Sequence, residues 1–324
     1  MGIPILTDSP EQILEFFPKA PDWRHLNSRS LAAPLANLWE KISPGASVWT
    51  TDSHDRITGG GWDALAIIDQ APGSQFDALH QAASAGTALP AAVACLALRG
   101  HGFHGNRNRA WAAVKGNLHL ATFHACNVPV AKVGQGFSIL PTVAAARAIM
   151  GRISPDARIG IKWINDILVG GRKIAGSLTS TQVESDVYES VVTGLGMNIE
   201  RTPPVETSRF VPKAACLADT LGGSGLTLPD LLPDILREFS VAYRQLVSGG
   251  HAELLRDYRD FSCCVGEQVA IWAEEVSDFA SSKPLAQGRL ISINDDLSLN
   301  IEGCPNPIYN GRLTFTNHSH STTS

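Results

Sequence analysis

The order of hydrophobic and polar residues predicts a chain of alternating strands and helices. Apolar runs of roughly four to eight residues, bounded by glycine, proline or polar residues, are typical of buried strands. Apolar positions that recur every three or four residues indicate a helix. By these rules we predict strands at 62–69, 91–98, 118–123, 159–161, 167–169 and 187–193, and helices at 13–17, 31–42, 75–85, 138–149, 228–247 and 252–258.

The last part of the chain has a different character. Short stretches there alternate between apolar and polar residues, and turn-forming residues separate them. This pattern predicts a small β-barrel, with strands at 267–272, 288–293, 297–301 and 312–315. The polar residues after Thr316 predict a disordered tail.

A two-glycine turn at 170–171 lies between apolar runs and predicts a tight hairpin, because glycine tolerates the positive φ that such turns need. The hairpin brings Asp166 close to Lys173, with Lys162 and Asn165 just ahead of it. Two cations beside a carboxylate and an amide are costly on apolar strands unless they bind something charged. We therefore predict a ligand site here. The alternative is a structural ion pair between Asp166 and one of the two lysines.

Charge is unevenly distributed along the chain. The formal net charge is −5, yet no Asp or Glu lies between Asp77 and Asp156. That span instead carries seven cations: Arg99, Arg107, Arg109, Lys115, Lys132, Arg147 and Arg152. A local positive field on an acidic protein favours a small anionic ligand over a nucleic acid, which would favour a basic domain.

A glycine-rich loop follows the strand at 91–98. Gly100, Gly102 and Gly105 have the spacing of a dinucleotide-binding motif, but polar residues follow where that motif needs an apolar helix. The free amides and the arginines of this loop instead suit phosphate oxygens. His101 and His104 are an alternative pair of metal ligands, but no third ligand follows at a suitable spacing. We therefore predict no certain metal site.

Three motifs in order resemble the central signature of biotin protein ligases. They are Lys-Trp-x-Asn-Asp at 162–166, Lys-Ile-Ala-Gly at 173–176 and Gly-x-Gly-x-Asn at 194–198. The Arg-x-Arg-x-Trp at 107–111 resembles the end of that family's glycine- and arginine-rich loop, although histidine and phenylalanine stand where earlier arginines are usual. The second motif is shared with lipoate ligases.

The resemblance implies an α+β fold, a mixed β-sheet flanked by helices, with a small C-terminal SH3-like β-barrel. It implies a helical extension at 1–45, a catalytic ligase domain at 46–261, the barrel at 262–316 and the tail at 317–324. Some members carry an N-terminal DNA-binding domain. This chain shows no basic recognition helix in its first part, so none is expected.

The resemblance also implies roles for individual residues. Lys173, Arg109 and Asp166 would be catalytic. ATP or the adenylate would be bound by Gly105, Arg107, Arg109, Trp111 and Asn198. Biotin would be bound by Ser74, Gln75, Gly100, His101, Gly102, Lys173, Gly176, Gly194 and Gly196. Lys162, Trp163 and Asn165 would shape the site. For Ser74, a helix N-cap is an equally good interpretation.

The implied activity is ATP-dependent activation of biotin as biotinyl-5′-AMP, followed by transfer to a lysine of a biotin carboxyl carrier protein, the carrier of acetyl-CoA carboxylase or a related carboxylase. ATP and Mg²⁺ are the expected cofactors, and a homodimer is left open. The alternatives are a lipoate or octanoate ligase or transferase, and a catalytically weakened binding or regulatory homologue. Six cysteines without a C-x-x-C pair and the lack of a long apolar run predict a cytoplasmic protein that binds no membrane.

Overall fold

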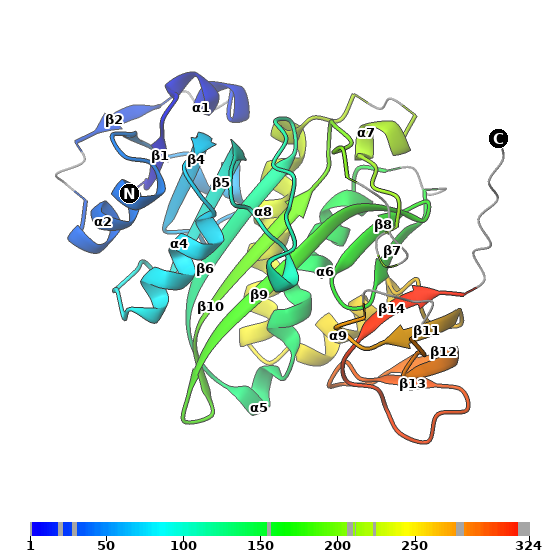
Figure 1. Ribbon diagram of the computed structural model, residues 1–324. Helices are drawn as coiled ribbons and strands as arrows, with labels where there is room; N and C mark the ends of the chain where they lie inside the picture. Colours follow the sequence, from blue (N-terminus) through cyan, green and yellow to red (C-terminus); the bar gives the residue numbers. More distant parts are fainter. Residues whose placement is uncertain are drawn as a thin grey trace.

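The computed structural model describes residues 2–18, 22–27, 31–153, 157–205, 210, 212–222, 225–276 and 282–316. Its centre is a ten-stranded mixed sheet with the order β2-β3-β1-β4-β5-β6-β10-β9-β8-β7 (Figure 1). The strands are β1 Ile3–Thr7, β2 Arg24–Leu26, β3 Ser47–Thr51, β4 Ala64–Ala71, β5 Ala92–Gly100, β6 Leu118–Pro129, β7 Ile159–Lys162, β8 Asp166–Val169, β9 Arg172–Glu184 and β10 Val187–Met197. The predicted mixed sheet is confirmed.

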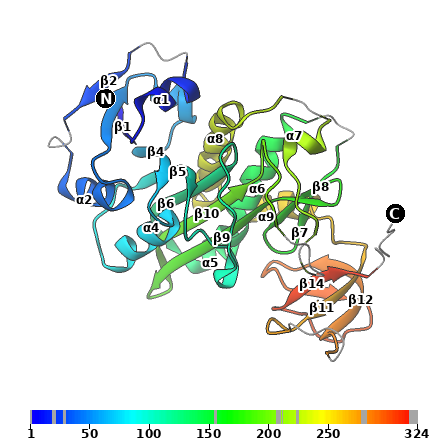
Figure 2. The ribbon, with the colours of Figure 1, turned by 45° about the horizontal axis from the view of Figure 1, so that its top comes forward.

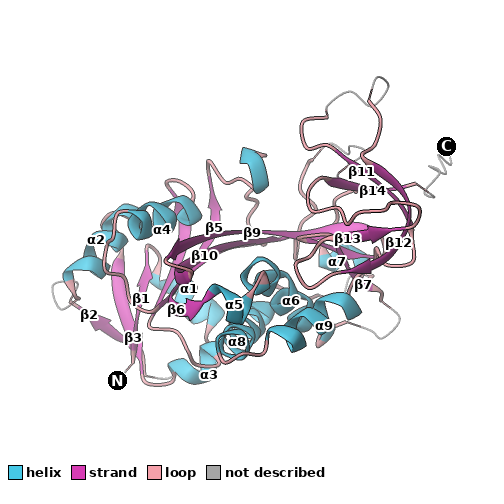
Figure 3. Cartoon of the chain, turned by 90° about the horizontal axis from the view of Figure 1, so that it is seen from below, coloured by secondary structure: helices cyan, strands magenta, loops and turns pink. Residues whose placement is uncertain are grey.

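Helices cover both faces of this sheet, and each face has its own apolar core. Leucines, isoleucines and alanines of α2 and α4 pack on one face, whereas α6, α8 and α9 pack on the other (Figure 3). The helices are α1 Pro10–Phe16, α2 Ala33–Ile42, α3 His54–Thr58, α4 Gln75–Ser84, α5 Val130–Val133, α6 Gly136–Met150, α7 Leu217–Thr220, α8 Leu228–Val247 and α9 His251–Asp260. None of the helices in the described ranges is long and apolar enough to cross a membrane.

The predicted hairpin is present between β8 and β9. Gly170 and Gly171 both have positive φ, 56° and 77°, as a tight two-residue turn requires. Helix α8 begins at Leu228, as predicted. Thr227 and Asp230 form a capping box that stabilises its first turn.

The N-terminal segment differs from the predicted helical extension. It contains α1 and α2, but β1 lies inside the main sheet, antiparallel to β3 and parallel to β4. Ile5 and Leu6 are fully buried there, so this short apolar run is part of the core. The division into domains at residues 45, 261 and 316 stays a prediction, and the tail at 317–324 lies outside the described residues.

A second sheet of four strands, in the order β13-β12-β11-β14, lies beside the β7 end of the main sheet (Figure 2). Its strands are β11 Gln268–Trp272, β12 Ala286–Ile293, β13 Leu299–Ile301 and β14 Arg312–Phe315, as the alternation predicts. The indole nitrogen of Trp163 donates a hydrogen bond to the Leu297 carbonyl oxygen at 2.8 Å and so joins the two sheets. Closure of this sheet into an SH3-like barrel stays a prediction.

Candidate active site

Most of the residues predicted for the site line one pocket, which opens on the face of the sheet that carries α4. Its floor is the first half of β9 and the end of β10, where Gly176 and Gly196 are direct register partners and Gly194 lies opposite Leu178. Glycines inside a strand leave space for a ligand to approach the backbone closely. The walls are the first turn of α4, the loop between β5 and β6, and three residues after β10, which are Pro203, Val205 and Ala214.

An ion pair between Lys173 and Asp166 lies in this pocket. Their Nζ and Oδ1 atoms are 2.6 Å apart, and each side chain is 17% exposed. Burial alone would raise the pKa of Asp166, but the charges of Lys173 and Lys162 outweigh burial and hold that pKa below its usual value. The carboxylate is therefore ionised. The ion pair expected under the alternative, structural interpretation of these residues is present.

Lys162 is buried behind the pocket, with 5% of its surface exposed. Burial lowers the pKa of its ammonium, and the nearby carboxylate of Asp166 partly offsets this effect. Its Nζ donates to the carbonyl oxygen of Phe210 at 2.9 Å. Lys162 thus links Phe210 to β7 of the main sheet, and its site-shaping role stays a prediction.

The loop between β5 and β6 runs across the face of the sheet in front of β10 and β9 (Figure 1). Arg109 lines the pocket, and its Nε donates to the carbonyl oxygen of Asn106 at 3.1 Å. Arg107 does not line the pocket. Its guanidinium forms an ion pair of 2.9 Å with Glu274, which follows β11 of the second sheet. The two loop arginines are therefore in different environments.

His104 anchors the same loop to α4. Its Nε2 lies 3.0 Å from Oδ1 of Asp77, and its Nδ1 lies 3.1 Å from the carbonyl oxygen of Gly105. The hydrogen bond to Asp77 raises the pKa of His104. Backbone hydrogen bonds from Gly105 to Arg109 and from Trp111 to Phe103 give the loop an internal hairpin.

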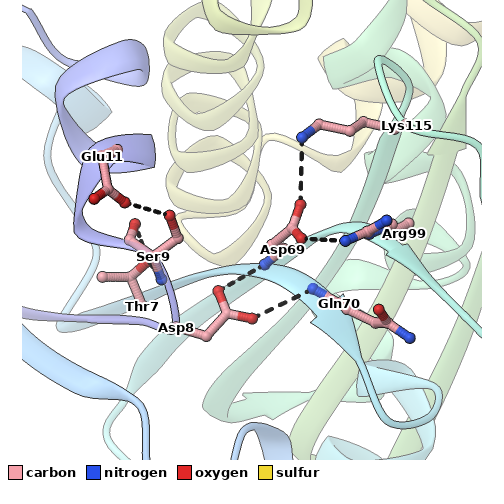
Figure 4. Close-up of polar contacts among 8 residues, drawn as sticks. All are labelled: Thr7, Asp8, Ser9, Glu11, Asp69, Gln70, Arg99 and Lys115. Atoms are coloured by element: carbon pink, nitrogen blue, oxygen red, sulfur yellow. Dashed lines mark hydrogen bonds and ion pairs between the residues drawn. The ribbon is translucent and has the colours of Figure 1, made fainter.

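Both ends of this loop meet at Asp69, as Figure 4 shows. One carboxylate oxygen of Asp69 pairs with Arg99, at the start of the loop, at 2.6 Å, and the other with Lys115, at its end, at 3.4 Å. Asp8 in turn accepts hydrogen bonds from the backbone N–H groups of Asp69 and Gln70. These groups are partly exposed, so each pair contributes little energy, but together they define where the loop leaves the sheet.

Three further predicted residues lie in the pocket with distinct surroundings. The ring of Trp111 lies against Gly196, where an added Cβ would be 2.4 Å from Cε2 of the indole. The side chain of Asn198 is buried, and its amide nitrogen donates to the Ala215 carbonyl oxygen. Its Oδ1 has no hydrogen-bond partner among the described residues. Asn165 donates from its amide to the carbonyl oxygen of Ser177.

Ser74 and Gln75 lie at the start of α4. The hydroxyl oxygen of Ser74 accepts a hydrogen bond from the N–H of Asp77 at 3.2 Å, so the helix N-cap is present. Gln75 is 2% exposed and lines the pocket. Neither the oxygen nor the nitrogen of its side-chain amide has a partner among the described residues. A buried, unpaired amide in a pocket wall is costly unless a ligand pairs with it.

Not every predicted residue reaches the pocket. The lining does not include Gly100, His101, Gly102, Arg107, Lys162 or Trp163. Their predicted ligand contacts stay predictions.

Conversely, the lining includes residues that the sequence interpretation missed, among them Phe76, Phe103, His119 and Leu178. Strand alternation was the available signal for His119, since it shares a sheet face with Ala121 and Phe123, which belong to the same core as α4.

A protein-held metal centre finds no support in the described ranges. They contain no group of three or more His, Cys, Asp or Glu side chains placed to hold a metal ion. Among the described residues that line the pocket, Asp166 supplies the one carboxylate, and it is already paired with Lys173.

Comparison with known proteins shows the class to which this fold belongs. Residues 87–198 match the model of the biotin/lipoate A/B protein ligase family. The fold resembles that of the biotin protein ligase of Aquifex aeolicus in complex with biotin and ATP. The TM-score is 0.57 at 16% identity, over 77% of this chain and 97% of that one.

The amino-acid sequence is also similar to those of individual biotin ligases. A biotin–[acetyl-CoA-carboxylase] ligase of Mycobacterium tuberculosis is 30% identical over 227 residues, which cover 66% of this chain and 76% of the relative. The bifunctional ligase/repressor BirA of Escherichia coli is 23% identical over 245 residues, 75% of this chain and 72% of the relative. The chain belongs to the biotin protein ligase family.

Proposed function

We propose that this protein is an ATP-dependent ligase that activates biotin and transfers it to a lysine of a carrier protein. In the first step a carboxylate oxygen of biotin attacks the α-phosphorus of ATP, and pyrophosphate leaves. In the second step the ε-amine of the carrier lysine attacks the acyl carbon, and AMP leaves. Both steps need cations where negative charge develops. Lys173 would meet the acyl carboxylate and the α-phosphate, with Asp166 holding its ammonium in place.

The observation that carries biotin over a fatty acyl group is the buried amide of Gln75. Both of its polar atoms lack a partner among the described residues, and it lines the wall of the pocket next to Phe76 and Leu178. The ureido ring of biotin offers N–H donors and a carbonyl acceptor that can pair with such an amide. An octanoyl or lipoyl chain would leave the amide unpaired, and a site that leaves buried polar groups unpaired discriminates strongly against that ligand.

The remaining polar groups of the pocket suit a nucleotide. Trp111 offers a flat ring for stacking, and the unpaired Oδ1 of Asn198 is an acceptor for the amino group of adenine. Arg109 would contact the phosphates. Mg²⁺ would arrive on the triphosphate, because this ion is commonly bound through substrate phosphates and few protein carboxylates.

We further propose that the four-stranded second sheet is the SH3-like domain of the family and that the partner is a biotin carboxyl carrier domain. The ion pair between Arg107 and Glu274 supports a role for the second sheet in holding the loop over the pocket. The presence of Lys173, Asp166, Arg109 and Asn198 in one pocket supports turnover over a purely regulatory role.

Pyrophosphate release tests this function. Purified protein is mixed with Mg-ATP and either biotin, lipoate or octanoate, and then with a biotin carboxyl carrier domain. Biotin should give the fastest release, and the carrier should gain one biotinyl group by mass. Release with octanoate or lipoate but not with saturating biotin would favour the alternative acyl groups. No release with any of the three would favour the weakened homologue.

A further inference from the structure

The indole of Trp111 is hydrogen-bonded to the side chain of His119. His119, on β6, is the register partner of Gly196 on β10, the glycine against which that indole packs. The indole Nε1 lies 3.2 Å from Nδ1 of His119, and His119 Nε2 lies 3.2 Å from the carbonyl oxygen of Val114. His119 is 3% exposed.

These two contacts fix the protonation of His119. An indole N–H can only donate, so Nδ1 of His119 must accept, and a carbonyl oxygen can only accept, so Nε2 must donate. The ring is therefore neutral, with its proton on Nε2. Burial lowers the pKa of His119 to about 4, which favours the same form at neutral pH. Phe103 packs beside the imidazole, with ring centroids 5.7 Å apart.

The orientation of the indole matters for the proposed chemistry. Nζ of Lys173 lies 6.0 Å from the centroid of the Trp111 ring while it pairs with Asp166. Gly196 limits movement of the ring toward the floor of the pocket, but it cannot fix rotation within the plane of the ring. A hydrogen bond at the edge of the ring can do so, and His119 is the side chain that accepts it.

We propose that His119 is a positioning residue that holds the Trp111 indole in the orientation needed to stack on the nucleotide. The proposal rests on the proposed function, since it assigns the ring to ATP. The residue acts through Trp111 and does not itself need to touch the substrate. Its loss should therefore weaken ATP binding and leave biotin binding nearly unchanged.

The test compares His119→Leu, which removes the acceptor, with His119→Asn, whose Oδ1 is attached to the same carbon position as Nδ1. His25→Leu, on the exposed strand β2, is the matched control. The KM for ATP should rise about tenfold in His119→Leu and much less in His119→Asn, the size expected for loss of one hydrogen bond. The dissociation constant for biotin alone should change by less than about twofold in both variants, because Trp111 is assigned to the nucleotide.

Two readouts separate positioning from general damage. In a ¹⁵N spectrum, the Trp111 indole resonance, identified by its absence in Trp111→Phe, should shift upfield in His119→Leu and stay near its wild-type position in His119→Asn. In a double-mutant cycle, His119→Leu should add no further loss of ATP affinity to Trp111→Phe, because both changes remove the same contact.

The possible failures are distinguishable. An unshifted indole resonance together with an unchanged KM in His119→Leu would overturn the role of His119, as would additive losses in the cycle. A wild-type protein that releases no pyrophosphate would instead refute the proposed function. The spectra would then still decide whether His119 holds the indole.

Discussion

Replacing Lys173 with methionine should lower both the activity and the stability of the protein. Methionine keeps most of the length of the side chain but removes the charge 2.6 Å from Asp166. Losing one main transition-state charge contact typically lowers kcat about a hundredfold to a thousandfold. The same change leaves a carboxylate that is only 17% exposed without its closest cation. We therefore expect loss of activity and loss of stability together.

The size of the stability loss follows from the surroundings. Breaking a fully buried ion pair costs about 3–5 kcal/mol. Asp166 keeps some exposure, and its register partner Lys162 still supplies a positive charge. We thus expect the free energy of unfolding to fall by about 1–3 kcal/mol, the range for one unpaired buried group. Denaturant unfolding of Lys173→Met, beside the exposed control Lys41→Met, measures this value.

A double variant then distinguishes the two interpretations of the ion pair. Asp166→Asn combined with Lys173→Met removes both charges and should recover most of the lost stability. If Lys173 carries the chemistry, pyrophosphate release should stay low in the double variant. Recovery of activity together with stability would show that the pair is structural and would refute the catalytic assignment.

Three further predictions concern the pocket and the core. Gln75→Leu should weaken biotin binding about tenfold or more and leave ATP binding unchanged, whereas Ser74→Ala should mainly lower the stability of α4. Calorimetric titration of both variants with biotin and with ATP checks this, and a larger loss of biotin affinity in Ser74→Ala than in Gln75→Leu would contradict it. Arg109→Ala should weaken ATP binding more than Arg107→Ala, because only Arg109 lines the pocket, and equal ATP dissociation constants for the two variants would contradict this. Burial lowers the pKa of His124 to about 3, so the unfolded chain binds this proton first, and stability should fall by up to about 1.4 kcal/mol per unit as the pH drops below about 6.5. Unfolding of the wild type and His124→Phe between pH 7 and 5 should show the smaller slope in the variant.

Local signals in the sequence were sufficient for much of the fold. The glycine pair at 170–171 predicted the hairpin, because a tight turn depends on a few neighbouring residues. The apolar periodicity at 228–247 predicted α8, because a helix likewise depends on nearby residues. The strand at 3–7 was missed since its burial depends on β3 and β4, which follow far along the chain. Propensity alone does not report such distant pairing.

The candidate site shows the same limit. Lys173 and Asp166 were predicted together because one short hairpin joins them. The contact between Trp111 and His119 depends on the register of β6 with β10, and the partner of Arg107 comes from the second sheet. Neither the strand register nor the docking of that sheet can be deduced from residue spacing.

The loop residues that depart from the family pattern have structural contacts of their own. His104 pairs with Asp77 of α4, and Phe103 packs against His119. With these side chains engaged, Arg109 is the one guanidinium among the described residues that line the pocket. Neutralisation of the triphosphate would then depend on Arg109 and Lys173, with Mg²⁺, rather than on a row of loop arginines. Fewer protein cations at the phosphates would make ATP binding depend more steeply on each of the two, which is why their substitution is the most informative perturbation of this site.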